Sequence, residues 1–235
     1  MFRDHTVGVI IPALNEEDAI PEVVRAIDRS VADWVVVVDN GSTDETAKSA
    51  ETAGAAVLVE SRRGYGSACL RALNDGPAAD IYVFLDGDGS DDPEELERIL
   101  DPLQDDDMDI VIGSRTRGVS EPGALTFLQR CGNALTCSLV RLFWGVTYTD
   151  LGPFRAVKNR CLSVLNMSDP DFGWTIEMQV KAARLGLRVV EIPVRYRNRR
   201  AGKSKVSGTI MGSFQAGWRI LAYVFRAKLS ELFGI

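Results

Sequence analysis

Five short apolar segments alternate with helical patterns in the first half of the chain, and this alternation is what most restricts its fold. The apolar segments are rich in Val and Ile and predict buried strands at residues 7–11, 34–38, 56–59, 81–85 and 110–112. The segments between them predict helices at residues 20–27, 42–53, 64–73 and 91–100. Strands that alternate with helices predict an α/β fold, with one mostly parallel, twisted sheet flanked by helices.

The second half of the chain is less regular. Residues 125–144 predict one long amphipathic helix whose leucines on one side are Leu128, Leu135, Leu139 and Leu142. The later segments are predicted as a helix at residues 174–185, a strand at residues 188–194, a basic loop at residues 195–208 and a last helix at residues 209–233. We expect one domain over residues 1–208 and a C-terminal amphipathic helix, residues 209–235, that belongs to the same domain or contacts a membrane surface.

The composition is that of a globular protein, with 46% hydrophobic and 26% charged residues among 235. No apolar run reaches about 18 residues, so no membrane-spanning helix is expected. The N-terminus has no secretory signal pattern, which predicts a cytoplasmic location. The four cysteines form no CxxC pair and His5 is the one histidine, which argues against a zinc site and against hydrolases that need a core histidine.

Charge is unevenly distributed along the chain. The net charge of −6 combines −18 over residues 1–110 with +12 over residues 111–235. The acidic half could hold a metal ion, and the basic half could hold phosphates or lie on an anionic surface. The alternative is uneven solvation of two faces. An acidic first half argues against a nucleic-acid-binding protein.

Polar residues follow three of the predicted strands, at residues 12–16, 39–42 and 86–88. In parallel sheets ligands bind beyond the carboxyl ends of the strands, so these segments are expected to form one site. The carboxylates of Asp86 and Asp88 are separated by one glycine, Gly87, and can share a hard divalent cation with its bound phosphates.

Two further segments suit phosphates. Residues 62–66, Arg-Arg-Gly-Tyr-Gly, resemble a phosphate-binding loop that opens a helix, although Cys69 replaces the third glycine of a dinucleotide fingerprint. Six cations, interrupted by Gly202 and Ser204, suggest a loop that closes over a diphosphate, and they are Arg195, Arg197, Arg199, Arg200, Lys203 and Lys205. The alternatives are a solvated basic loop or one that touches nucleic acid.

Taken together, these segments resemble family 2 glycosyltransferases of the Rossmann-like glycosyltransferase A fold, in particular the dolichol-phosphate mannose and glucose synthases. The resemblance covers about residues 6–210. The segments that carry it occur in the order of the family and are IIPALNEE, VVVDNGSTDET, RRGYGSACLRAL, FLDGDGSDDPEEL, DIVIGSR, YTDLGPFRA, GWTIEMQVKAARLG and EIPVRYRNRRAGKSKVSG.

The resemblance implies a role for each matching residue. Asp86 and Asp88 would hold Mg²⁺ or Mn²⁺ on the donor diphosphate. The nucleotide-sugar site would comprise Pro12, Ala13, Asn15, Glu16, Asp39, Gly41, Ser42, Gly64, Gly66, Asp86, Gly87, Arg199, Lys203, Ser204 and Lys205. The catalytic residues would be Asp88, Arg115, Arg130, Asp150 and Glu177. Arg115 and Arg130 would hold an acceptor phosphate, and Glu177 is near the position where many members of the family have a catalytic carboxylate. Asp150 would lie near the sugar, together with Gly152, Phe154 and Arg155.

The implied enzyme is an inverting, metal-dependent hexosyltransferase that moves a hexose from GDP-mannose or UDP-glucose to a polyprenyl or dolichyl phosphate. An ionised phosphate needs no strong base, but arginines must offset its repulsion from the donor. The sequence departs from the family pattern at two positions. Ser90 stands where mannose synthases often have a glutamine, which weakens the assignment of mannose as the transferred sugar. Asn40 stands where many members have a second acid, so the site has one carboxylate fewer.

Two alternatives stay open. One is transfer to a soluble or glycan hydroxyl, for which Glu177 could be the base. The other is a non-catalytic nucleotide-sugar-binding protein, which the intact Asp86 and Asp88 disfavour. A homo-oligomer is also possible.

The last predicted helix has an apolar stripe formed by Ile210, Phe214, Trp218, Leu221, Phe225 and Leu229. This stripe could lie in the surface of the inner face of a membrane, as in a peripheral protein, and residues 125–144 are a second candidate for the same surface. The alternative is that the stripe packs on the core or on a second subunit.

Overall fold

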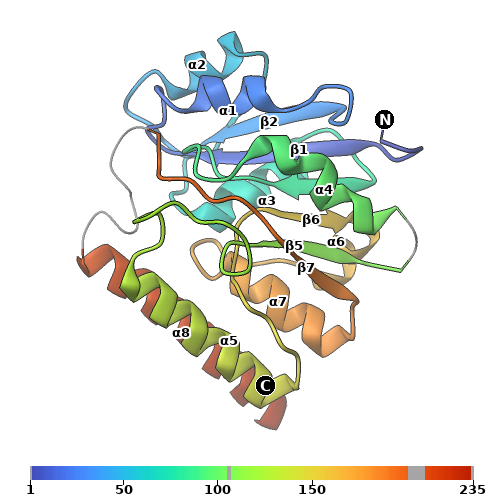
Figure 1. Cartoon of the computed structure of the whole chain (residues 1–235), viewed down its shortest axis with the longest axis vertical. Helices are drawn as coiled ribbons and strands as arrows, with labels where there is room; N and C mark the ends of the chain where they lie inside the picture. Colours follow the sequence, from blue (N-terminus) through green and yellow to red (C-terminus); the bar gives the residue numbers. More distant parts are fainter. Residues whose placement is uncertain (1, 105–106, 201–209, 234–235) are drawn as a thin grey trace.

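A computed structural model describes residues 2–104, 107–200 and 210–233, with the side chains of the last helix described from residue 217. Over these residues the chain forms one seven-stranded sheet in the order β3-β2-β1-β4-β6-β5-β7 (Figure 1). The strands are β1 (Val7–Ala13), β2 (Trp34–Asp39), β3 (Ala56–Val59), β4 (Ile81–Phe84), β5 (Ile110–Ser114), β6 (Arg155–Lys158) and β7 (Val189–Pro193).

Helices cover both faces of this sheet. They are α1 (Ile20–Ala26), α2 (Thr46–Thr52), α3 (Tyr65–Asp75), α4 (Leu96–Leu100), α5 (Phe127–Trp144), α6 (Asn159–Leu165), α7 (Trp174–Leu185) and α8 (Ile210–Phe233). Strand residues alternate between two cores: Ile10 of β1 packs with α3, α6 and α7, whereas Val9 and Ile11 pack with α1 and α4. Helices on both faces and a mainly parallel sheet confirm the predicted fold class.

One strand departs from the parallel arrangement. β6 runs antiparallel to both of its neighbours, β4 and β5, and the sequence did not predict it. Its four residues, Arg155–Lys158, are all buried but begin and end with cations, so they lack the apolar run that marks the other strands. Pairing with β4 and β5, which lie far away in sequence, creates this strand.

Helix starts were predicted with mixed success. Asp92 caps the turn before α4, because its Oδ1 accepts from the backbone N of Glu94 at 3.3 Å. The helix predicted from residue 42 begins later, because α2 starts at Thr46 and has no side-chain cap. A capping box does start α5, where Thr126 and Gln129 each accept from the backbone N of the other.

The last helix, α8, lies beside α5 along the edge of the molecule away from the sheet (Figure 1). It contacts α5 and α7, and Val224 and Ala227 on its inner side are buried. The predicted boundary between residues 208 and 209 lies outside the described residues. None of the described helices has the length and apolar character needed to cross a membrane.

Candidate active site

The carboxyl ends of β1, β2, β4 and β5 open on a cavity of about 710 Å³. It is also bordered by the start of α3, by the segment after β7 and by α5 and α8. Nine of the predicted site residues line the cavity: Pro12, Ala13, Glu16, Gly64, Asp86, Gly87, Asp88, Arg115 and Arg199. Eight other predicted site residues do not line the cavity, and they are Asn15, Asp39, Gly41, Ser42, Gly66, Arg130, Asp150 and Glu177. The remaining three, Lys203, Ser204 and Lys205, lie outside the described residues.

Asn15 and Ser42 hold the loops after β1 and β2 together. The backbone N of Asn15 donates to Ser42 Oγ at 2.9 Å, and Thr43 N donates to Asn15 Oδ1 at 2.8 Å. Asn15 has a left-handed backbone with φ of 53°, which asparagine tolerates better than most residues. Asp39 accepts from Ser42 N at 3.1 Å. These predicted nucleotide-binding residues therefore shape the wall of the cavity from behind.

Asn40, noted as a departure from the resembled family, has a role that a carboxylate could not fill. Its Nδ2 donates to the carbonyls of Glu60 at 3.1 Å and Arg62 at 2.8 Å, and its Oδ1 accepts from Gly64 N at 2.8 Å. An aspartate has no donor for the two carbonyls when it is ionised. The amide thus fixes the loop that leads into α3 at the edge of the cavity.

The glycines at the start of α3 make room for protein and not only for a ligand. A Cβ on Gly66 would lie 1.9 Å from the carbonyl oxygen of Asp169, and one on Gly64 would lie 2.1 Å from that of Pro170. The same Pro170 oxygen accepts from Ser67 N at 2.8 Å. Gly64 lines the cavity, whereas Gly66 does not line it and packs against the 169–170 turn.

Asp86 and Asp88 lie at the end of β4 and form the acidic part of the cavity. Burial, and then the charge of Asp88, raise the pKa of Asp86 to about 7. Asp86 Oδ1 is buried and has no hydrogen-bond partner among the described residues. Asp88 Oδ1 accepts from Ser90 N at 2.9 Å and from Ser90 Oγ at 2.6 Å. Two neighbouring carboxylates at a strand end, one of them with an unpartnered buried oxygen, fit a hard divalent ion such as Mg²⁺ or Mn²⁺.

The protein supplies only part of such a cation site. Among the residues that the structure describes, no three His, Cys, Asp or Glu side chains converge in a way that could hold a metal. Asp91 lies near Asp86, whose backbone N it accepts from at 3.3 Å, and burial raises the pKa of Asp91 above its ordinary value. In the sequence, Asp91 is only the first residue of the helix predicted at residues 91–100. A cation held by Asp86 and Asp88 would take its other oxygens from diphosphate and water.

Arg199 reaches this acidic pair from the segment after β7. Its Nη1 lies 2.5 Å from Glu16 Oε1, and its Nη2 lies 3.0 Å from Asp88 Oδ2. The nearby Arg197 is anchored by Asp92, whose Oδ2 lies 2.7 Å from Arg197 Nη2. The described part of the basic segment therefore borders the cavity through Arg197 and Arg199.

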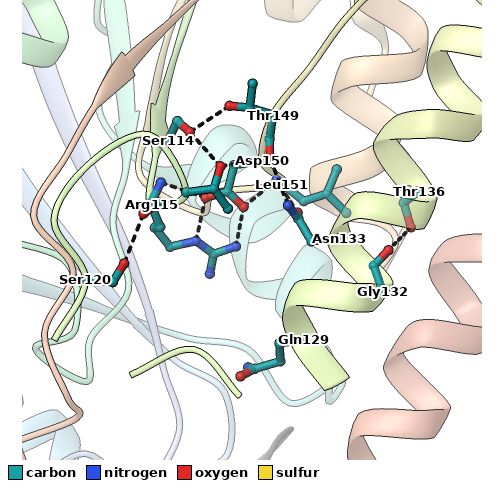
Figure 2. A network of polar contacts seen from close by, with 12 residues as sticks. Ser114, Arg115, Ser120, Gln129, Gly132, Asn133, Thr136, Thr149, Asp150 and Leu151 are labelled. Carbon is teal, nitrogen blue, oxygen red and sulfur yellow. Dashed lines mark hydrogen bonds and ion pairs between the residues drawn. The ribbon is translucent and has the colours of Figure 1, made fainter. Parts of the chain in front are cut away.

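Arg115, which lines the cavity, forms an ion pair with the fully buried Asp150 (Figure 2). Asp150 accepts from Arg115 N at 2.7 Å, Nε at 2.9 Å and Nη2 at 2.7 Å, and the guanidinium lies over the ring of Tyr196. Burial alone would lower the pKa of Arg115, but Asp150 outweighs it and raises that pKa above its ordinary value. The contacts to Asp150 use Nε and Nη2, which leaves Nη1 for an anion in the cavity.

Asp150 is itself held from behind. The loop that carries it is tied to α5, since Asn133 Nδ2 donates to Thr149 O at 2.9 Å and Leu151 N donates to Asn133 Oδ1 at 2.8 Å (Figure 2). Asp150 N also donates to Glu191 at 3.1 Å. Asp150 is fully buried and does not line the cavity, and its two oxygens hold the Arg115 side chain in place.

Two predicted catalytic residues lie elsewhere. Arg130 is exposed on the first turn of α5, and Gln129 lines the cavity in its place. Glu177 is fully buried and accepts from Ser168 N, Ser168 Oγ and Asp169 N at 2.7–3.1 Å, while Lys181 pairs with it at 2.7 Å. A carboxylate saturated in this way is not placed to act as a base. Glu177 instead fixes the turn that precedes the cavity residues Asp171 and Phe172.

The sequence missed Arg219 and Ile220 of α8, which line the cavity with Asp171. Arg219 forms an ion pair with Asp171. The apolar stripe of α8 predicted only a packing or surface helix, and no local motif indicated that one of its arginines faces the ligand site. The uneven charge of the two halves was the one signal that pointed to further arginines there.

A sequence profile of glycosyl transferase family 2 matches residues 8–157, which hold the strand ends and both aspartates of the acidic pair. The chain belongs to glycosyltransferase family 2. This confirms the resemblance and the predicted enzyme class. An uncharacterised glycosyltransferase of Mycobacterium tuberculosis is 37% identical to this one over 221 residues, 92% of this chain and 98% of that protein.

Two other relatives of this glycosyltransferase have informative names. The undecaprenyl-phosphate mannosyltransferase of Micrococcus luteus is 31% identical over 220 residues, 86% of this chain and 88% of that protein. Glucosyl-3-phosphoglycerate synthase of Mycobacterium tuberculosis, solved with Mn²⁺, UDP-glucose and glycerol 3-phosphate, has a TM-score of 0.76 at 25% identity over 99% of this chain and 81% of that chain. The predicted metal-dependent hexosyltransferase agrees with these relatives.

Proposed function

We propose that this glycosyltransferase moves a hexose from a nucleoside-diphosphate sugar to a polyprenyl phosphate, with inversion at the anomeric carbon. The observation that carries the acceptor assignment is the state of the four acids that line the cavity. Glu16 and Asp88 pair with Arg199, Asp171 pairs with Arg219, and Asp86 lies with Asp88 in the proposed cation site. No cavity acid in the described part of the chain is left for a base, and an ionised phosphate acceptor needs none.

The names of two relatives support the two halves of this proposal. The Micrococcus luteus enzyme is named for an undecaprenyl-phosphate acceptor, and the solved synthase holds UDP-glucose with Mn²⁺. A divalent cation at Asp86 and Asp88 would neutralise charge on the leaving diphosphate. Arg199, which already lies beside both Asp88 and Glu16, is placed to contact the same diphosphate.

At the acceptor end, Arg115 offsets the repulsion between the two phosphates. An oxygen of the acceptor phosphate attacks the anomeric carbon as the bond from that carbon to the donor phosphate breaks, and the nucleoside diphosphate leaves with the bonding electrons. Attack from the side opposite the leaving group inverts the configuration. Asp150 keeps the Arg115 fork in place, so little reorganisation is needed when the acceptor binds.

A hydroxyl acceptor is the second candidate, and Asp171 is the observation that favours it. This carboxylate lines the cavity beside Arg219 of α8, and it would become a possible base if a ligand drew Arg219 away. The solved synthase holds glycerol 3-phosphate, an acceptor-sized molecule with hydroxyl groups.

One assay tests the proposal. The protein is incubated with Mn²⁺, with labelled GDP-mannose or UDP-glucose, and with either a short-chain polyprenyl phosphate or 3-phosphoglycerate. Label in the organic phase with the lipid acceptor supports the proposal and identifies the donor. Label only in the aqueous product with 3-phosphoglycerate would overturn the lipid acceptor in favour of a hydroxyl acceptor.

A further inference from the structure

The outward side of α5 and α8 is apolar to an unusual degree for this molecule. Nine of the thirteen exposed large hydrophobic side chains among the described residues belong to these two helices. On α5 they are Phe127, Leu128, Leu135 and Leu142, and on α8 they are Trp218, Phe225, Leu229, Leu232 and Phe233. We call these nine residues the α5–α8 face. Patches of this kind mark interaction surfaces in soluble domains.

The exposed side of each helix is not its packing side. In α5 the buried residues are Thr136, Cys137 and Val140, whereas Leu128, Leu135 and Leu142 recur every seven residues along the outside. The leucine side that the sequence singled out therefore points outward, except for the half-buried Leu139.

The two helices present their exposed sides together. They lie side by side in Figure 1, and the rings of Phe143 and Phe225 meet edge to face with centroids 5.8 Å apart. Val224 and Ala227 bury the inner side of α8, which leaves Phe225 and Leu229 exposed. In the described part of the predicted stripe, Trp218, Phe225 and Leu229 are exposed and Leu221 is half-buried, whereas the side chains of Ile210 and Phe214 lie outside the described residues.

The charge of the two helices is cationic although the whole chain carries −6. α5 has Arg130 and Arg141 and no acid, and α8 has Arg219, Arg226, Lys228 and the single acid Glu231. Glu231 accepts from Trp144 Nε1 at 2.8 Å and pairs with Arg184 and Lys228, so its charge is compensated. Arg219 and Lys228 are paired with Asp171 and Glu231, and the remaining cations of the two helices, Arg130, Arg141 and Arg226, are exposed. An apolar face that carries exposed cations is complementary to an anionic lipid surface.

The α5–α8 face adjoins the cavity. Thr126 and Gln129 at the start of α5 and Arg219 and Ile220 of α8 line the cavity, and the exposed Phe127 lies among them in sequence. A surface that contacts the face would therefore lie next to the cavity.

We propose that the α5–α8 face docks this protein on the surface of an anionic lipid bilayer and so presents the cavity to a lipid-borne phosphate. The second clause rests on the proposed function, and the first does not. A second copy of the chain is a poorer occupant, because two identical cationic faces would repel each other when placed together.

The test uses vesicles of phosphatidylcholine with phosphatidylglycerol and without any polyprenyl phosphate. The full chain should co-sediment with these vesicles at low salt, bind pure phosphatidylcholine vesicles at least about tenfold less, and be released as salt rises. Leu142→Glu should lower the bound fraction about tenfold, because it places a charge in the apolar face. Val164→Glu, the same kind of change at an exposed residue of α6, is the matched control and should bind as the unchanged chain does.

Several outcomes would overturn the proposal. The unchanged chain could stay in the supernatant at low salt, or Val164→Glu could lose as much binding as Leu142→Glu. A dimer that Leu142→Glu converts to monomer, with no vesicle binding by either, would identify the face as a subunit interface. Thermal melting checks that Leu142→Glu is folded, and Leu135→Glu tests the same row two turns away if it is not.

The docking proposal and the proposed function fail separately. Vesicle binding without transfer to polyprenyl phosphate would leave the docking proposal standing and remove the lipid acceptor. Transfer to a short-chain acceptor without vesicle binding would do the reverse. Leu142→Glu should keep its rate with a short-chain acceptor in solution and lose rate only when the acceptor is embedded in vesicles.

Discussion

Arg199 donates to Asp88 across a 3.0 Å ion pair, although the two residues come from segments that lie far apart in the chain. The same guanidinium reaches Glu16. Burial alone would lower the pKa of Arg199, but Asp88 and Glu16 together raise it above its ordinary value. Arg199 therefore supplies positive charge at the place where the acidic pair would hold a divalent ion.

The first prediction concerns competition for Asp88. Arg199→Gln removes the positive charge beside Asp88, so the variant should bind free Mn²⁺ several-fold more tightly in the absence of donor. It should also bind the nucleotide sugar more weakly, because a diphosphate contact is lost. Electron paramagnetic resonance of free Mn²⁺ measures the first effect. Arg200→Gln, whose side chain pairs with Glu22 instead, is the control.

The second prediction concerns the acidic pair itself. Asp88→Asn should reduce transfer at least about a hundredfold even at saturating Mn²⁺, since it removes one ligand charge. The melting temperature should change little, because Asp88 lies at a partly exposed strand end and not in either core. Glu97→Gln, on the exposed side of α4, makes the same charge change away from the cavity and should leave the rate unchanged. Near-normal turnover of Asp88→Asn would refute the assignment.

The third prediction separates binding from positioning at the acceptor end. Arg115→Ala should lower kcat/KM for the acceptor by an amount equivalent to roughly 1.5–3 kcal/mol, and it should leave binding of the donor unchanged. Asp150→Asn leaves Arg115 in place without its buried counter-charge, and breaking such a pair costs about 3 kcal/mol of stability. Acceptor titrations and chemical denaturation give both numbers. A donor defect in Arg115→Ala would show that the phosphate sites are exchanged.

The fourth prediction decides between the two acceptor classes. Asp171→Asn should change kcat less than about tenfold if the acceptor is a phosphate, because no base is needed. If a hydroxyl is the acceptor and Asp171 removes its proton, kcat should fall by about a hundredfold or more and the pH dependence should lose its acidic limb. The pH profile of kcat separates this loss from a merely structural effect of freeing Arg219.

The fifth prediction is a pH dependence of stability at the far end of the sheet. Burial alone would raise the pKa of Asp109, but hydrogen bonds from Arg188 and Arg160 outweigh it and lower that pKa to about 2. Since the folded pKa is depressed, the contribution of Asp109 is present above about pH 4 and is lost as the pH falls toward 2. Both arginines are about half exposed, so the contribution is only about 1–2 kcal/mol.

The variant Asp109→Asn isolates this effect. The difference in unfolding free energy between the two proteins should be largest at neutral pH and should shrink between about pH 4 and pH 2. Urea denaturation at a series of pH values measures it. A difference that stays constant over that range would mean that the ion pairs of Asp109 do not account for the stability it contributes.

The sequence predicted well what is encoded locally. The strand ends carry their polar residues with them, so the sequence alone identified Pro12, Glu16, Asp86 and Asp88 as neighbours in one site. A parallel sheet brings the carboxyl ends of its strands to one edge, and this rule needs no knowledge of side-chain contacts.

The sequence could not show which residues outside a motif contact the residues within it. Gly66 belongs to a segment that resembles a phosphate-binding loop, but in the fold it lies against the carbonyl of Asp169. Glu177 lies in a segment that resembles the family, but its carboxylate oxygens accept hydrogen bonds from Ser168 and Asp169. The periodicity of α5 located an apolar side and could not say that this side faces outward, because period alone does not show what covers a helix.

The antiparallel direction of β6 has a consequence for how acceptor choice could change over evolution or by engineering. β5 ends and β6 begins at the same edge of the sheet, where Gly113 N donates to Phe154 O at 2.8 Å. The segment between them includes Arg115, Asp150 and all of α5. It therefore leaves the sheet and re-enters it at adjacent positions. Because β5 and β6 are already paired at this point, we expect changes in the length of the segment between them to leave the strand register and the positions of Asp86 and Asp88 unchanged.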